Sequence, residues 1–143
     1  MREILFRGKT LATESKWVEG FYNHIPCGRF QCDEHLIQTI DEVGRIGQMY
    51  NVRESTVGQF TGLTDKNGTK IFEGDIIRIP YDYDEYGHNA GEIYEVYFFS
   101  GGFRLKPKYS KARGYWLEDD GVFRVIGNIH DNPELLGGKN DGK

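Results

Sequence analysis

The stretch TGLTDKNGTKIFEGDIIRI, residues 61–79, constrains the fold of this chain more than any other segment. DKNG at residues 65–68 has the composition of a type I turn that ends in a left-handed glycine, a common hairpin loop. At residues 74–75, Gly-Asp predicts a sharp bend, because glycine permits a close backbone approach and aspartate caps local N–H groups. The isoleucine-rich run at residues 76–79 predicts the next strand. The segment therefore predicts a corner of a small β-structure rather than a catalytic loop.

Short apolar runs separated by turn residues continue along the rest of the chain. The 143 residues include 19 glycines, nine tyrosines and nine phenylalanines, a composition that favours short strands and tight turns over long helices. Residues 27–44 suit either a helical or a strand period, and we favour strands there. Near the end, residues 132–136 predict one helical turn, with Asn132 as N-cap and Pro133 at the first helical position.

These patterns predict an all-β chain. About five short strands between residues 62 and 136 match the number that a small SH3-like barrel requires. We therefore expect an N-terminal β-rich lobe at residues 1–61, an SH3-like β-barrel lobe at 62–137 that ends in the short helical turn, and a disordered tail at 138–143. One continuous domain over residues 1–137 is the open alternative.

Charge and hydropathy restrict the class of protein. The chain carries 18 basic and 22 acidic side chains, and its net charge of −4 argues against bulk, non-specific coating of nucleic acid. The N-terminus MREILFRGKT lacks the apolar region of a signal peptide, and no apolar run approaches the ~18 residues of a membrane span. We expect a cytoplasmic protein without a membrane partner, in which Cys27 and Cys32 stay reduced.

Three blocks carry a family resemblance: TVGQFTGLTDKNGTKIFEGDII, GEIYEVYF and the terminal VIGNIHDNPELL. Together with MREILFRG and WVEGFY they resemble the YopX family of phage and prophage proteins over nearly the whole chain. The resemblance implies a β-rich protein with an SH3-like barrel, a bacteriophage or prophage origin and a bacterial host cell. It does not imply an enzyme, and no catalytic residues carry over from it. The matched glycines, Asp75, Asn128 and Pro133 all have structural explanations.

A metal-binding pattern occurs at residues 24–35. His24, Cys27, Cys32 and His35 have the spacing H-x2-C-x4-C-x2-H, and two thiolates with two imidazoles can close a tetrahedral zinc site. The spacing does not match the two distant pairs of a zinc finger. We therefore expect no metal and no other cofactor, with zinc on these four residues as the open alternative.

An acidic, tyrosine-rich loop spans residues 81–92. Asp82, Asp84 and Gly87 fall at positions 1, 3 and 6 of a calcium-binding EF-hand loop, but Tyr86 and Ile93 stand where two oxygen ligands are needed. A solvated loop between two strands is the better interpretation. Because loops beside a barrel often carry binding residues, Tyr83 and Tyr86 are candidate partner contacts.

A basic, aromatic segment follows at residues 103–116. Its cations occur without an acidic residue and alternate with Phe103, Tyr115 and Trp116, the composition of a nucleic-acid surface. The alternative is a solvated loop beside core aromatics, which the acidity of the whole chain favours. The candidate binding residues of this segment are Arg104, Lys106, Lys108, Tyr109, Lys111 and Arg113.

No sequence motif of a known catalytic site is present. Ser100 lies in a glycine turn, but the G-x-S-x-G elbow, the P-loop and the zinc-protease motif are all absent. We therefore predict a non-enzymatic module that binds a host or phage protein and is able to self-associate. A nucleic-acid-associated protein that uses residues 103–116 is the second hypothesis, and a hydrolase with an unrecognised site is the third.

Overall fold

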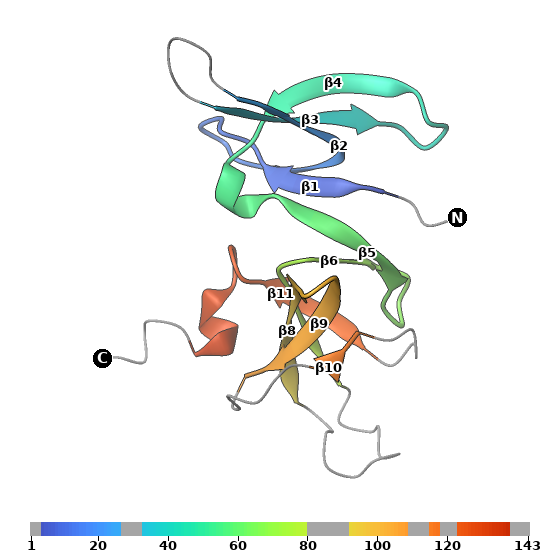
Figure 1. The fold of residues 1–143 in the computed structure, drawn as a ribbon, viewed down its shortest axis with the longest axis vertical. Helices are drawn as coiled ribbons and strands as arrows, with labels where there is room; N and C mark the ends of the chain where they lie inside the picture. The colour runs from blue at the N-terminus through green and yellow to red at the C-terminus, as the bar shows by residue number, and fades with distance from the viewer. Residues whose placement is uncertain (1–3, 27–32, 80–91, 109–114, 118–122, 138–143) are drawn as a thin grey trace. The chain divides into compact units, whose positions relative to one another are not determined.

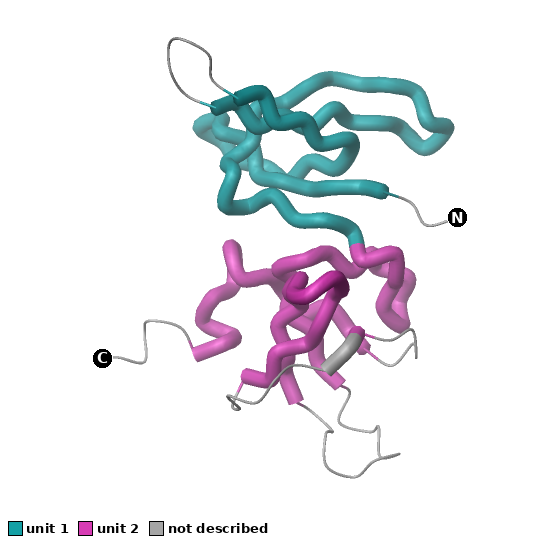
Figure 2. Tube along the Cα trace, in the orientation of Figure 1, with its two compact units in different colours: residues 1–60 teal, residues 61–143 magenta. Residues whose placement is uncertain are grey.

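The computed structural model describes residues 4–26, 33–79, 92–108, 115–117 and 123–137. The chain divides into two compact units, residues 1–60 and 61–143, coloured teal and magenta in Figure 2. Nearly all regular structure in both units is β-strand, which confirms the all-β prediction.

Unit 1 is an antiparallel sheet. Its strands are β1 (Phe6–Lys9), β2 (Trp17–Ile25), β3 (Glu34–Ile40), β4 (Ile46–Asn51) and the beginning of β5 (Gly58–Thr64), with the short 3-10 helix η1 at Glu54–Thr56. The hydrogen-bonded order is β4-β3-β2-β1-β5, and β6 (Lys70–Phe72) follows β5 in the same order. Strand β3 confirms the preference for strands within residues 33–44, whereas residues 27–32 of that region lie outside the described residues (Figure 1).

Alternation along the strands of unit 1 places a small core on one face of its sheet. Val18, Ile37 and Val52 are buried together, and Phe6, Tyr22, Tyr50 and Val57 pack around them. Within β2, Gly20 lies so close to the neighbouring strand that an added Cβ would sit 1.9 Å from the backbone oxygen of Gln38. Glycine at this position therefore allows β2 and β3 to approach.

Unit 2 is built on a five-stranded antiparallel sheet in the order β10-β9-β8-β7-β11. The strands are β7 (Asp75–Arg78), β8 (Ile93–Phe99), β9 (Gly102–Pro107), β10 (Tyr115–Trp116) and β11 (Arg124–Asn128). Its core contains Ile71, Ile77, Ile79, Tyr94, Val96, Leu105 and Phe123. The predicted helical turn is the 3-10 helix η2 at Pro133–Leu136.

Two details differ from the sequence-based expectations. Among the described strands, the end strands β10 and β11 do not pair with each other, so closure into an SH3-like barrel is not observed and the sheet is open. Asn132 is the N-cap residue but makes no side-chain capping bond to the helical turn. Its Oδ1 instead accepts the backbone N–H of Asn128 at 3.2 Å, because Gly127 leaves room for the side chain to fold back.

Candidate functional site

The turn at residues 65–68 is organised by a single buried carboxylate. Asp65 is 6% exposed; its Oδ1 accepts the backbone N–H groups of Asn67 and Thr69, and its Oδ2 accepts that of Val125. Burial alone would raise the pKa of Asp65, but these three donors and the nearby Arg124 charge together lower it. This carboxylate serves to join the turn to β11.

Backbone hydrogen bonds hold the bend at residues 74–75 in place. Gly74 adopts a φ of +94°, its N–H donates to the carbonyl of Val96, and its carbonyl accepts the N–H of Ile129. Asp75 is 1% exposed, and its Oδ2 accepts the N–H of Phe72 at 2.7 Å, which confirms the predicted capping role. The sharpest motif of the sequence is therefore used to build the fold.

An aromatic and cationic surface lies on the hairpin formed by β8 and β9. Strand alternation turns Tyr94, Val96, Phe103 and Leu105 to the core. The opposite side, which we call the hairpin face, consists of Glu95, Tyr97, Phe99, Arg104 and Lys106.

The centre of the hairpin face is a cation–aromatic pair. Tyr97 stands directly opposite Arg104 in the strand register, and the Arg104 guanidinium lies 5.7 Å from the centre of the Phe99 ring. Phe99 is 61% exposed, and Arg104 Nε donates to its carbonyl oxygen at 3.2 Å. These three residues and Ser100, which has a φ of +53°, line an open pocket of about 420 Å³. The pocket offers ring surface and a positive charge together.

A carboxylate moderates the positive charge of the hairpin face. Glu95 stands opposite Lys106 in the register. Burial raises the pKa of the Glu95 carboxyl, and the Lys106 charge opposes that shift. Unlike a groove that follows a phosphate backbone, the described face therefore carries both signs of charge.

The candidate residues of the basic segment are only partly described by the structure. Arg104 and Lys106 lie in β9, and Lys108 follows it, donating its N–H to the carbonyl of Ile93. Phe103, expected as a stacking surface, is 9% exposed and packs against the ring of Phe98, because alternation turns it to the core. Tyr83, Tyr86, Tyr109, Lys111 and Arg113 lie outside the described residues.

The sequence interpretation did not select Tyr97 and Phe99. Both belong to the apolar run at residues 93–99, which reads as a buried strand when taken alone. The signal that finds them is the alternation within that run, combined with its pairing to β9.

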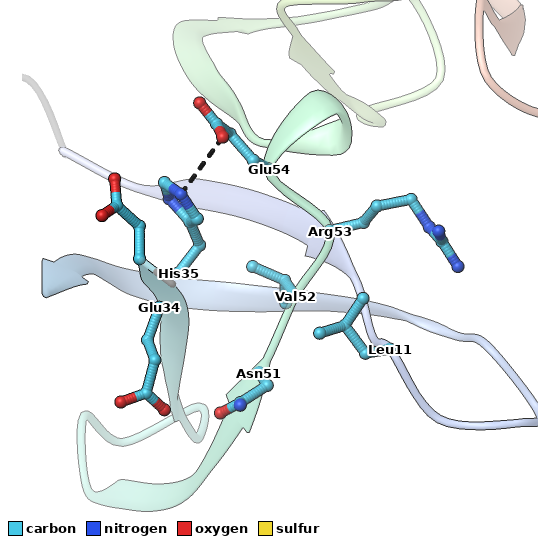
Figure 3. A pocket seen from close by; sticks show the side chains of 8 residues that line it. Leu11, Glu34, His35, Asn51, Val52, Arg53 and Glu54 are labelled. Atoms are coloured by element: carbon cyan, nitrogen blue, oxygen red, sulfur yellow. Dashed lines mark ion pairs between the residues drawn. The ribbon is translucent and has the colours of Figure 1, made fainter. Parts of the chain in front are cut away.

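Unit 1 carries a second candidate site beside the buried ring of His35. Its side chain is 9% exposed, its Nδ1 hydrogen-bonds the Tyr22 hydroxyl, and its Nε2 lies 3.3 Å from Glu54 Oε2. Figure 3 shows the His35 ring facing the Glu54 carboxylate, whereas Arg53 points away from that pair. Burial raises the pKa of Tyr22, and the charges of Glu54 and Asp33 add to this effect.

A pocket of about 460 Å³ opens next to His35. It is lined by Leu11, Asp33, Glu34, His35, Asn51, Val52, Arg53 and Glu54, most of which are labelled in Figure 3.

The structure brings together His24 and His35, two of the four residues of the H-x2-C-x4-C-x2-H pattern, and adds Asp33. His24 Nε2 lies 2.9 Å from Asp33 Oδ2, and one ligand atom each from His24, Asp33 and His35 falls within a span of 4.8 Å. Cys27 and Cys32 lie outside the described residues, as do Asp82, Asp84 and Gly87 of the acidic loop. At the end of that loop, Glu92 Oε2 accepts the Tyr94 hydroxyl hydrogen bond at 2.6 Å.

Comparison with known proteins gives a family match and a similar solved structure. In the described part of the chain, no helix is long and apolar enough to cross a membrane. No curated protein sequence gives a significant match. The crystal structure of protein EF1440 from Enterococcus faecalis is similar, with a TM-score of 0.51 and 25% sequence identity over 95% of this chain and 99% of that one. The sequence profile described as YopX protein matches residues 8–137. The chain therefore belongs to the YopX family.

Proposed function

We propose that this protein is a non-enzymatic binding module, and that the hairpin face of unit 2 docks an acidic segment of a bacterial host protein in the cytoplasm. The observation that carries the proposal is the pocket of Tyr97, Phe99 and Arg104, in which a largely exposed ring lies beneath a guanidinium. Aromatic residues and arginine are the side chains most enriched at the centres of protein interfaces.

Charge selects the chemistry of the partner. The pocket offers ring surface for an apolar side chain and a guanidinium for a neighbouring carboxylate, which arginine can bind through two parallel hydrogen bonds. The mixed charge of Glu95 and Lys106 beside it suits a protein surface better than a polyanion. Buried carboxylates elsewhere support a non-enzymatic role, because Asp65 and Asp75 are occupied by backbone N–H donors.

The test is an affinity capture from bacterial lysate with and without nuclease, using the full chain and two matched variants. The double variant Phe99→Ser with Arg104→Glu removes the ring and reverses the charge of the pocket. The control Val43→Ser alters a side chain that is 74% exposed on the turn between β3 and β4. We expect one host protein whose capture persists after nuclease treatment. The wild type and the control should capture it, and the double variant should not. Equal capture by all three proteins would contradict the proposal.

Nucleic-acid binding is the second candidate, because Arg104 and Lys106 share the hairpin face with two aromatic rings. Phosphate binding weakens steeply with salt, whereas a mixed protein interface weakens less. Fluorescence anisotropy with a single-stranded oligonucleotide at increasing salt measures this difference. Saturable binding with a steep salt slope, lost on Arg104→Glu and Lys106→Glu, would replace the protein-docking proposal.

A further inference from the structure

Three potential metal ligands converge at one end of the β2–β3 hairpin in unit 1. His24 and His35 are direct cross-strand partners, and their rings stack with centres 4.6 Å apart and planes inclined by only 3°. Asp33 precedes His35 by two residues and therefore lies on the same face of the hairpin. Its Oδ2 lies 2.9 Å from His24 Nε2.

The spacing of these atoms is close to that of a metal centre. With metal–nitrogen and metal–oxygen bonds of about 2.1 Å, the ligand atoms of a tetrahedral site are roughly 3.4 Å apart. The observed separations begin at 2.9 Å and stay within 4.8 Å. Because an imidazole binds a metal in the plane of its ring, two parallel rings cannot share one ion while they stack, so the His24 ring must turn out of the stack to close the site. His24 and Asp33 are 43% and 46% exposed, which leaves both side chains room to move.

His35 provides a second, independent observation. Its Nε2 is buried and, among the described residues, finds no hydrogen-bond partner, although Glu54 Oε2 is 3.3 Å away. The close contact with the carboxylate satisfies the distance for an ion pair without the alignment of a hydrogen bond. On the other side of the ring, Tyr22 holds Nδ1. A histidine fixed through one nitrogen, with the other unsatisfied, is the arrangement that metal ligands show when an outer partner orients the ring.

The geometry points to a site for a divalent transition-metal ion on His24, Asp33 and His35, and we propose that Zn²⁺ occupies it. Two neutral imidazoles and one carboxylate are ligands that zinc accepts, whereas calcium and magnesium require a shell of oxygens. Tyr22 is the outer partner at Nδ1, whereas the Glu54 carboxylate lies beside Nε2, next to the position of the ion. Asp33 and His35 also line the pocket of Figure 3, so a fourth position on the metal would be open to solvent or a small ligand.

The test uses the full chain without a histidine tag, stripped of metal and titrated with Zn²⁺ in competition with a chromogenic chelator. We expect one Zn²⁺ per chain. His24→Asn and Asp33→Asn should each weaken binding by more than about 100-fold, beyond the 10–100-fold loss expected for an outer partner such as Tyr22 in Tyr22→Phe. Both ligand variants change exposed side chains, and circular dichroism verifies that they fold. His130→Asn, a histidine change in unit 2, should leave the affinity unchanged.

Cobalt identifies the ligands by a separate readout. Co²⁺ in a tetrahedral site of nitrogen and oxygen ligands shows visible d–d bands of moderate intensity, whereas a cysteine thiolate adds a more intense near-ultraviolet charge-transfer band. We expect the visible bands without the charge-transfer band, and their loss in His24→Asn. Three results would overturn the assignment: no stoichiometric Zn²⁺ binding, binding that His24→Asn and Asp33→Asn leave intact, or a thiolate band in the cobalt spectrum.

Discussion

Replacing Asp65 by asparagine tests whether the turn of residues 65–68 is fastened to β11 by charge. Asparagine retains an oxygen for the N–H groups of Asn67 and Thr69, which lie 2.8 and 2.9 Å from Oδ1. It replaces Oδ2 by an amide nitrogen, so the Val125 N–H at 3.0 Å loses its acceptor and meets another donor. One lost hydrogen bond to a charged group corresponds to about 1.5–3 kcal/mol. We expect the free energy of unfolding of unit 2 to fall by that amount.

The effect of Asp65→Asn on stability should also depend on pH. Because the folded-state pKa of Asp65 is lowered, its contribution to stability is complete above the unfolded-state pKa of about 3.9 and is lost as the pH falls through the folded-state value. Asp65→Asn cannot titrate at this position. The difference in stability between wild type and variant should therefore narrow below about pH 4.

Urea unfolding followed by circular dichroism at pH 7 and at pH 3.5 measures both effects. Glu134→Gln is the matched control, because it removes one negative charge from an exposed side chain of unit 2. At pH 7 the free energy of unfolding of the control should lie within about 0.5 kcal/mol of the wild-type value, the range of ordinary surface substitutions. A difference that small for Asp65→Asn, or one that widens in acid, would refute the proposed role of the carboxylate.

Three further substitutions test the packing. Gly20→Ala should prevent the β2–β3 pairing, because its Cβ would lie 1.9 Å from the backbone oxygen of Gln38; a native-like amide NMR spectrum for unit 1 would contradict this. Ile37→Ala empties a fully buried position and should lower the free energy of unfolding by about 2–5 kcal/mol in urea titrations. Gly127→Ala brings a Cβ to 2.6 Å from Asn132 Oδ1 and should lower thermal stability, and the added Asn132→Ala should restore part of it.

Much of the local structure is predictable from the sequence, because its causes lie within a few residues. The turn at residues 65–68 ends in Gly68 with a φ of +84°, and Asp75 caps a neighbouring N–H, as the residue types indicate. The capping bond expected of Asn132 fails for a similarly local reason. Gly127 leaves space next to the Asn132 side chain. Asn132 Oδ1 therefore accepts the backbone N–H of Asn128, at the end of β11, instead of capping the helical turn.

The two candidate sites were less predictable, because both depend on strand pairing. Residues 103–116 form a basic run in the sequence, yet the pocket combines Arg104 with Tyr97 and Phe99 from the other strand of the hairpin. Likewise, the spacing of histidines and cysteines in the sequence does not single out Asp33 as a metal ligand. Only the register of β2 against β3 places the imidazoles side by side with that carboxylate next to them.

Both sites are built on a cross-strand pair, so both depend on the register of their hairpin. Tyr97 faces Arg104, and His24 faces His35, only because each hairpin keeps its register. A slip of one residue would turn these side chains to the opposite face of the sheet, so the buried residues between them protect the sites as well as the fold. In the hairpin of unit 2, the register is held by the cross-strand pair of Val96 and Leu105. Both side chains are buried, with exposed fractions of 0% and 3%. The motif at residues 61–79 and the proposed functional surfaces are thus separate in sequence, but each surface requires a well-packed core behind it.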